Sequence, residues 1–367
     1  MKKILAILIL NTICYSAYGK TFELDYNTRL DVNGYAGYKY ITSSAQDTVN
    51  NSEPELGLAL SLQLTDNLSA YTQFAYANDI ETSLVYSFLS YDYLINPDFR
   101  VGIKAGKLRH EYGLYNSSRI NPRTRQGVIM PQSIYWDSLR YRLASGVGIN
   151  FNLRWKNLEL SYTIDQPTVT DPQYEGLVWA PGLLNQVSSD FGSHQIASLK
   201  YSFSTIPLIF KASWTNNNLG SDNTKIHDIV FPDNNEQIME LLNLGVEYNY
   251  EKLTLSAEAL LINTFFTEWD NFYSHGTSYT AKYEFSDKID LRINYNYYYT
   301  PALQRNKWLQ NTNDINIGIN YHEDDWMIGA EVHQVNGARW TNPADQSRGQ
   351  EEYNNWYIFA INAVYFF

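Results

Sequence analysis

Apolar and polar residues alternate along most of the chain with a period of two. In segment 56–64 every even position is leucine, whereas the odd positions hold Gly, Ala, Ser and Gln. Segments 147–155, 253–261 and 289–297 repeat the pattern, apart from an extra apolar residue at Leu260. Because successive side chains of a β-strand point to opposite faces, the pattern predicts strands with one apolar and one polar face.

The alternation recurs in enough segments to predict the strands of one large antiparallel sheet. A tilted strand of about 9–11 residues is long enough to cross a bilayer. The sixteen strands that we predict span residues 24–41, 55–64, 68–77, 83–93, 99–108, 146–155, 158–165, 195–203, 208–215, 240–250, 253–262, 275–285, 289–299, 312–321, 326–335 and 355–367.

The connections between these strands alternate in length. Turns after even-numbered strands are short, as at 65–67, 156–157, 251–252 and 286–288. Connections after odd-numbered strands are mostly long: 42–54, 109–145, 166–194, 216–239, 263–274, 300–311 and 336–354. A transmembrane β-barrel has tight turns on one side of the membrane and longer loops on the other. A soluble β-sandwich has no reason to sort its connections by parity, so the pattern favours a barrel.

The ends of the predicted strands also suit a membrane barrel. Trp155, Tyr250 and Trp326 flank short turns, and Tyr299 precedes a long loop. Aromatic rings in such places fit the two membrane–water interfaces. The last strand is apolar at alternate positions and ends at Phe367. An unpaired apolar edge promotes aggregation, so we expect this strand to close against the first one.

The first nineteen residues have the features of a secretory signal peptide. Two lysines precede the apolar stretch 4–10, and Ala17-Tyr18-Gly19 is a small-x-small cleavage site. We expect signal peptide 1–19 to be removed and residues 20–367 to form the barrel. The apolar stretch is too short to cross a bilayer as a helix. The one cysteine, Cys14, lies in the signal peptide, so we expect no disulfide in the exported chain.

Composition narrows the functional classes. Acidic residues outnumber basic ones by 39 to 27, which argues against nucleic acid as a partner. The mean hydropathy is −0.38, and no helix-length apolar run occurs after residue 19. These values exclude a helical membrane protein. They are compatible with a β-barrel, whose alternating strands average out as polar.

Together these features resemble the Gram-negative outer-membrane porins with sixteen strands. The long connection after the fifth predicted strand matches the loop that folds into the lumen of those porins. A local run is also similar to a group of porin-like channels; it comprises residues 113–116, Arg119, 131–133, Tyr135, Asp137 and Arg140. The resemblance implies an all-β transmembrane antiparallel barrel of about sixteen strands, with an inward-folded constriction loop at 109–145. It also implies a passive channel that assembles as a homotrimer.

Basic residues concentrate in and beside this connection. Residues 107–145 hold seven basic and two acidic residues in a chain whose net charge is −12. They are Lys107, Arg109, Arg119, Arg123, Arg125, Arg140 and Arg142, with Glu111 and Asp137. Arg154, Lys282 and Arg292 are expected to face the lumen by alternation. Rings of Arg or Lys in a pore select anions, so the sequence predicts an anion-favouring constriction.

Other roles for these residues stay open. The arginines can instead pair with acids of the barrel wall and pin the loop. Inward-facing candidates for that pairing are Glu159, Asp165, Glu247, Glu258, Glu284, Asp290 and Glu331. In that case the acidic wall favours cations or leaves the pore weakly selective. Tyr135 and Trp136 are alternative candidates for an apolar path for sugars.

Enzymatic chemistry has little support in the sequence. The six histidines are His110, His194, His227, His275, His322 and His333, and neither HExxH nor G-x-S-x-G occurs. We therefore expect no catalytic residues, no cofactor and no metal. A surface adhesin or a purely structural barrel is the alternative that is not a channel.

The sequence thus predicts a porin of the Gram-negative outer membrane, exported by its signal peptide, through which small hydrophilic solutes and ions diffuse passively. Its expected partners besides the solutes are outer-membrane lipid and lipopolysaccharide. Acidic residues of the predicted outer loops, such as Asp222 and Asp228, are candidates for bridging lipopolysaccharide phosphates through divalent cations.

Overall fold

The fold was obtained as a computed structural model of the chain. It describes residues 19–25, 28–44, 51–77, 80–118, 121–135, 145–167, 193–218, 225–226, 229–230, 237–266, 272–299, 311–337 and 355–367. Within these ranges the structure consists of β-strands, turns and one 3-10 turn, η1 (Asn116–Ser118). None of the helical structure there is long and apolar enough to cross a membrane. The predicted signal peptide, up to residue 18, lies outside the described residues.

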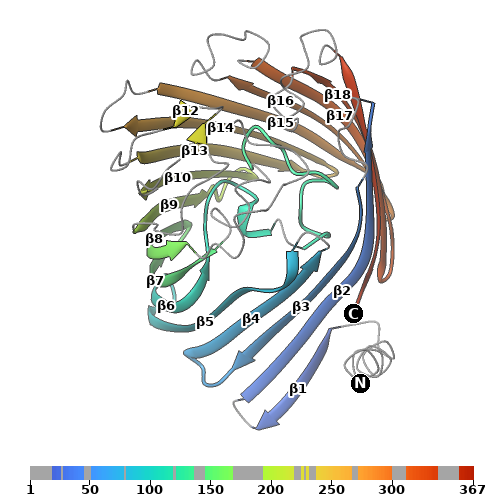
Figure 1. The fold of residues 1–367 in the computed structure, drawn as a ribbon. Helices are drawn as coiled ribbons and strands as arrows, with labels where there is room; N and C mark the ends of the chain where they lie inside the picture. Colours follow the sequence, from blue (N-terminus) through green and yellow to red (C-terminus); the bar gives the residue numbers. More distant parts are fainter. Residues whose placement is uncertain are drawn as a thin grey trace.

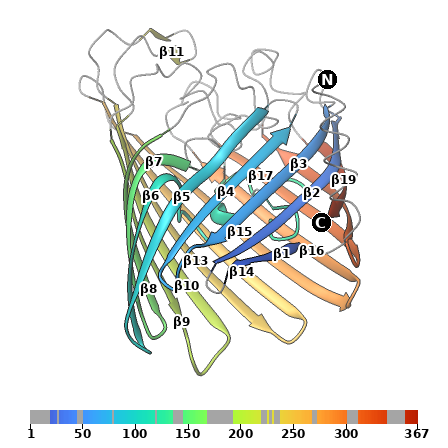
Figure 2. The same cartoon turned by 90° about the horizontal axis from the view of Figure 1, so that it is seen from below.

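Sixteen long strands form a closed antiparallel barrel (Figures 1 and 2). Each strand pairs with its neighbour in the chain, and β19 closes the barrel against β2. The sixteen are β2 (Thr28–Ser43), β3 (Asn51–Gln63), β4 (Leu68–Ala77), β5 (Ile80–Asn96), β6 (Phe99–Arg109), β7 (Ser145–Trp155), β8 (Leu158–Pro167), β9 (His194–Ser202), β10 (Leu208–Asn218), β13 (Gln237–Tyr250), β14 (Leu253–Phe266), β15 (Phe272–Ser286), β16 (Ile289–Tyr299), β17 (Asn311–Glu323), β18 (Trp326–Asn336) and β19 (Trp356–Phe366). A short pair, β11 (Lys225–Ile226) and β12 (Ile229–Val230), lies in the connection after β10.

All sixteen predicted strands are confirmed, with one difference at the beginning. The sequence predicts a continuous strand over 24–41, whereas the structure has a hairpin of β1 (Lys20–Asp25) and β2. β19 pairs with β2 from Tyr35 to Ser43, and β1 pairs with the same strand from Thr28 to Val32. Because β19 is shorter than β2, β1 pairs with the part of β2 that β19 does not reach.

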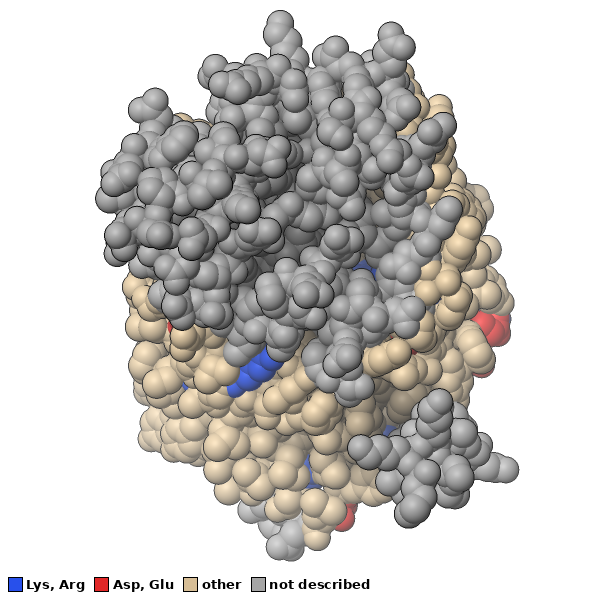
Figure 3. Space-filling view, in the orientation of Figure 1, with Lys and Arg blue, Asp and Glu red and all other residues tan. Residues whose placement is uncertain are grey.

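The two faces of the barrel are the reverse of those in a soluble protein. Ile293 on β16 is 56 % exposed, whereas its neighbours Arg292 and Asn294 are buried. Among the described residues visible in Figure 3, charged side chains appear at only a few points. A polar interior and an apolar outer band are the faces of a barrel that spans a membrane, so the predicted orientation of the strands is confirmed.

Short turns lie at one end of the barrel (Figure 2), and the strand ends that the longer connections join lie at the other. Two-residue turns join β7 to β8, β13 to β14 and β17 to β18. Each begins with a non-glycine residue at positive φ: Lys156 (50°), Glu251 (50°) and Asp324 (41°). Turns with positive φ match the right-handed twist of the flanking strands. β4 and β5 are the exception in length, because only residues 78–79 separate them at the long-loop end.

The described part of the connection between β6 and β7 lies inside the barrel. We call residues 110–144 the inner loop, of which 110–118 and 121–135 are described. In Figure 1 its teal trace crosses the space that the strands enclose. Ile134 and Tyr135 at its centre are fully buried. The described part of the inner loop therefore occupies part of the space that the strands enclose.

Candidate functional site

Two glutamates of the inner wall, buried Glu258 and half-buried Glu247, hold the inner loop. Glu258 on β14 accepts hydrogen bonds from the Leu114 backbone N–H (2.8 Å) and the Tyr135 hydroxyl (2.6 Å). Glu247 on β13 accepts one from the Tyr115 hydroxyl (2.6 Å). Burial and the nearby Glu258 raise the pKa of the Tyr135 phenol, which therefore stays a donor. Glu258 and Glu247 thus attach the loop through neutral donors rather than through arginines.

A third glutamate holds the later part of the loop. Glu331 on β18 accepts hydrogen bonds from the backbone N–H groups of Val128 (3.1 Å) and Ile129 (2.6 Å). It is also paired with Arg292 of β16. A buried carboxylate with several donors is far more stable than one left unpaired. Arg292 does face inward as predicted, but its charge is directed to Glu331.

Apolar patches on the inner wall complete the seat of the loop. Tyr112, Met130, Ile134 and Tyr135 of the loop pack against inward residues of β13, β14 and β16: Met239, Leu241, Leu260, Ile262 and Tyr298. Val128 and Ile129 pack against Ile41, Val335, Trp356, Ile358 and Ala360. Leu260 is the residue that departs from the alternation in the sequence. The packing also excludes Tyr135 from an open path for sugars, because its side chain is fully buried.

Arg125 pins the loop to the wall. Its two terminal nitrogens donate to the two carboxylate oxygens of Glu55 on β3, each at 2.9 Å. Burial alone would lower the pKa of Arg125, but Glu55 raises it above its usual range. Lys39 on β2 adds a second cation 3.6 Å from the same carboxylate. The pinning interpretation thus describes Arg125, with a glutamate that the sequence does not single out.

The other predicted site residues are dispersed. Arg123 donates to the Asp324 carbonyl (2.8 Å), and its guanidinium lies 4.2 Å from the Phe366 ring centroid. Arg109 donates to the Ser117 carbonyl (2.8 Å). Lys107 pairs across the sheet with outward-facing Val147, and its ammonium donates to the Leu84 carbonyl (2.6 Å). Four further predicted residues lie outside the described part of the chain: Arg119, Asp137, Arg140 and Arg142.

Glu111 faces a group of cations on strands β6 and β10. Its carboxylate lies 3.2 Å from the ammonium of Lys211 on β10. Burial alone would raise the pKa of Glu111, but the charges of Lys211, Arg109 and Lys104 hold this pKa at about 2. The carboxylate therefore stays ionised at neutral pH.

Strands β6 to β10 carry a row of cations that the sequence analysis singles out only at Arg154. Cross-strand pairing sets Arg100 opposite Arg154, Arg154 opposite Glu159, Glu159 opposite Lys200, and Lys200 opposite Lys211. We call Arg100, Arg154, Lys200 and Lys211 the basic row. Glu159 lies 3.9 Å from Arg154 and 3.7 Å from Lys200. Alternation along each strand could have placed these residues inward, but only the register aligns them.

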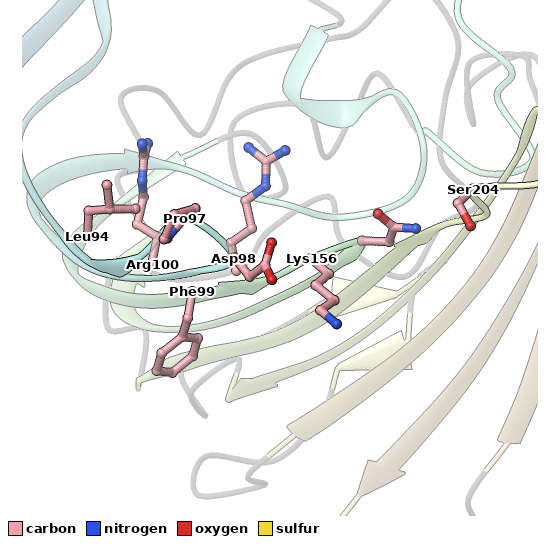
Figure 4. Close-up of a pocket in the computed structure, with 9 residues that line it drawn as sticks. Leu94, Pro97, Asp98, Phe99, Arg100, Lys156 and Ser204 are labelled. Carbon is pink, nitrogen blue, oxygen red and sulfur yellow. The ribbon is translucent and has the colours of Figure 1, made fainter.

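The basic row begins at a hollow near the short turns and continues beside aromatic rings. Arg100 and Arg154 line the hollow together with Asp98 and Lys156 (Figure 4). Further along β6, the ammonium of Lys104 lies 5.7 Å from the ring centroid of Phe88. Phe88 in turn lies near inward Tyr71, with 5.2 Å between ring centroids. Cations thus line one wall of the lumen over several strands.

Comparison with known proteins relates the chain to a fold rather than to close relatives. No family model and no curated protein matches the sequence. Among solved structures, OmpF of Salmonella typhi, in complex with daunomycin, is 14% identical with a TM-score of 0.66, covering 95% of this chain and 100% of its own. An anion-selective porin from Comamonas acidovorans is 10% identical with a TM-score of 0.63, at 93% and 100% coverage. The outer-membrane protein OmpT of Vibrio cholerae is 12% identical with a TM-score of 0.62, at 95% and 100% coverage.

These similarities extend over nearly the whole chain at low identity, so they concern the architecture. The closed barrel, its short turns at one end and its inner loop are features of the structure of this chain. This chain therefore has the fold of the Gram-negative outer-membrane porins, a closed barrel of sixteen antiparallel strands.

Proposed function

We propose that the protein is a passive outer-membrane channel for small hydrophilic solutes, with a preference for anions such as carboxylates and phosphate-bearing molecules. The observation that carries this proposal is the basic row on β6 to β10. Like charges directly opposite each other destabilise a sheet, yet Arg100 faces Arg154 and Lys200 faces Lys211. A field that attracts anions into a pore is a function that offsets this cost.

The source of the field differs from the one that the sequence suggests. Arg125 is neutralised by Glu55, and the described contacts of Arg123 lie near the C-terminal strand. The side chains of Arg154 and Lys200 are 63% and 39% exposed, so they can meet a solute in water. In this proposal the inner loop narrows the lumen, and the wall of β6 to β10 supplies most of the charge.

The structural neighbours support the wider proposal. One of them is an anion-selective porin, and OmpT of Vibrio cholerae has a trimeric form. We accordingly propose a homotrimer in the outer membrane, reached after removal of a signal peptide at 1–19. Lipid and lipopolysaccharide surround it in this proposal. The acidic loop residues proposed for cation bridging, Asp222 and Asp228, lie outside the described residues.

The experiment that tests the preference is the zero-current potential of the purified protein in a planar bilayer under a KCl gradient. We expect chloride preference in the wild type, and a potential near zero in the variant R100Q/R154Q/K200Q. The matched control is Lys288→Gln, which removes a cation from the exposed pair with Glu323 at a short turn. It should leave the potential unchanged.

Each other outcome has a definite meaning. Potassium preference in the wild type would contradict the proposal and favour the alternative in which Glu159 and the other acids set the field. Chloride preference that persists in the triple variant would exclude the basic row as its source. Absence of conductance would favour an adhesin or a structural barrel.

A further inference from the structure

A buried cluster of two histidines and one aspartate lies where the inner loop leaves the barrel wall. His110 is the first residue after β6, Asp165 is on β8, and His194 begins β9. The exposed fractions of the three residues are 0%, 4% and 1%. One ligand atom from each of them lies within 4.8 Å of the other two. The cluster plays no part in the anion preference proposed above.

The contacts within the cluster converge on the aspartate. One carboxylate oxygen of Asp165 lies 2.5 Å from Nε2 of His110, and the other lies 3.0 Å from Nδ1 of His194. The two imidazole rings meet edge to face with 4.7 Å between centroids. Three residues from separate segments thus direct nitrogen and oxygen atoms at one small volume.

Two glycines of β7 leave space for this arrangement. A Cβ atom at Gly146 would lie 2.5 Å from the carboxyl carbon of Asp165. A Cβ atom at Gly148 would lie 2.1 Å from the Ile164 carbonyl oxygen and 2.5 Å from the Asp165 Cα. Because these three distances are too short for a side chain at either position, Asp165 packs against bare backbone.

Hydrogen bonds alone do not satisfy the cluster. His110 Nδ1 and His194 Nε2 are buried and have no hydrogen-bond partner among the described residues. Each histidine therefore turns one nitrogen to Asp165, where an ion held by the three residues would bind, and keeps its second nitrogen without a hydrogen bond.

We propose that His110, Asp165 and His194 bind a divalent transition-metal ion, with Zn²⁺ as the ion that the ligand set fits. Two imidazoles and one carboxylate form a common Zn²⁺ ligand set, which leaves a fourth position for water. Each residue supplies one ligand atom. The ion displaces the protons that the histidines share with the carboxylate, so it binds more weakly at acid pH. From the sequence alone we expected no metal.

The ion would join the root of the inner loop to β8 and β9. Arg109 and Glu111 flank His110 directly, and Glu111 contacts the cations of the lumen wall. Metal binding would therefore stabilise the segment from which these two charges reach the lumen. This effect adds to the hydrogen bonds by which Glu258 and Glu331 of the wall hold later residues of the loop.

The test is a Zn²⁺ titration of metal-free folded barrel in detergent, in competition with a chromophoric chelator. We expect one Zn²⁺ per chain, with affinity at least tenfold weaker in His110→Gln and His194→Gln. The control is His275→Gln; the ring centroid of His275 lies 5.2 Å from that of Tyr299 on the outer face. It should bind as the wild type does. Heat-modifiable gel migration shows which variants are folded.

A second measurement uses only the wild-type protein, so it tests the proposal even when the variants fail to fold. Co²⁺ added to wild-type protein should give the intense visible absorption of a four-coordinate site, and one equivalent of Zn²⁺ should abolish it. Absence of stoichiometric Zn²⁺ binding to the wild type would overturn the proposal. So would wild-type affinity in folded His110→Gln and His194→Gln.

Discussion

At the residue scale, the interior of this barrel is organised by buried carboxylates. Glu258 and Glu331 each accept hydrogen bonds from backbone N–H groups of the inner loop, and Glu55 binds both terminal nitrogens of Arg125. Removing one partner of such a pair leaves an uncompensated charge, which costs far more than the pair contributes. Single substitutions at these positions therefore report on the attachment of the loop.

Arg125→Leu should destabilise the folded barrel because it leaves the Glu55 carboxylate with Lys39 as its cation. Breaking a buried pair costs about 3–5 kcal/mol, and both side chains are less than a tenth exposed. Urea unfolding in lipid vesicles measures the change. Lys288→Leu, at the exposed pair with Glu323, is the control and should leave the midpoint unchanged. Equal midpoints for both variants would contradict the assignment of Arg125 as an anchor.

Glu111→Gln should show a pH-dependent loss of stability. The pKa of Glu111 in the folded protein is about 2, below its ordinary value of 4.5, because nearby cations favour the ionised form. Its contribution to stability is therefore complete above pH 4.5 and disappears as the pH falls towards 2. The wild type should exceed the variant in unfolding midpoint by a constant amount from pH 8 to about 5. A difference that grows as the pH is lowered would contradict this sign.

At the element scale, the strands follow from local pattern, whereas their ends depend on their partners. The sequence predicts one strand over 24–41, but the chain turns between Asp25 and Thr28. β19 ends at Phe366, and the backbones of Gly34 and Phe367 exchange hydrogen bonds of 2.7 and 3.0 Å. The edge of β2 that precedes Gly34 in the chain is therefore available to β1. No feature local to residues 24–41 reveals where the last strand stops.

Deleting residues 20–25 should lower the stability of the barrel without opening it. The deletion removes the partner of β2 from Thr28 to Val32, and each backbone hydrogen bond contributes about 0.5–1.5 kcal/mol. We expect a loss of a few kcal/mol in urea unfolding, with unchanged single-channel conductance. Phe22→Thr changes an exposed side chain and keeps the backbone, so it should match the wild type. A deletion with wild-type stability would show that β1 contributes nothing to closure.

At the scale of the whole molecule, the inner loop fills one part of the lumen, and charged side chains of the wall line another part. The apolar residues of the loop pack on β13, β14, β16, β18, β19 and β2, and Glu111 at its beginning contacts Lys211 of β10. Arg100, Arg154 and Lys200 of the basic row lie on β6, β7 and β9. The loop thus reduces the open cross-section, and the wall of β6 to β9 carries the exposed charges of the row. Narrowing and selectivity can therefore be separated experimentally.

Replacing residues 114–132 by a short glycine-serine linker should raise the single-channel conductance several-fold while the sign of the zero-current potential persists. The variant should also unfold more readily, because Glu258 and Glu331 lose their donors from the loop. Planar-bilayer recording measures both electrical quantities. Loss of chloride preference in this variant would return the selectivity to the arginines that it removes, Arg119, Arg123 and Arg125.

Much of the architecture was accessible from the amino-acid order. A period of two is a local property, so the sixteen strands, their lipid and lumen faces and the parity of the connections could be predicted by inspection. The inner loop was located by its length and by resemblance to porins. The wall region that contacts the loop has a weaker signal in the sequence: Leu260 is apolar at an inward position, and it packs against the loop.

Only the tertiary structure decided which charges meet. Arg125 pairs with Glu55 seventy residues away, the basic row forms only where β6 to β10 pair in register, and His110 meets Asp165 and His194 across three strands. Strand register and barrel closure set these contacts, and neither is encoded in a local window. The sequence by itself therefore determined a barrel with a polar interior, and the closure of that barrel decided where its charges are neutralised and where they face the lumen.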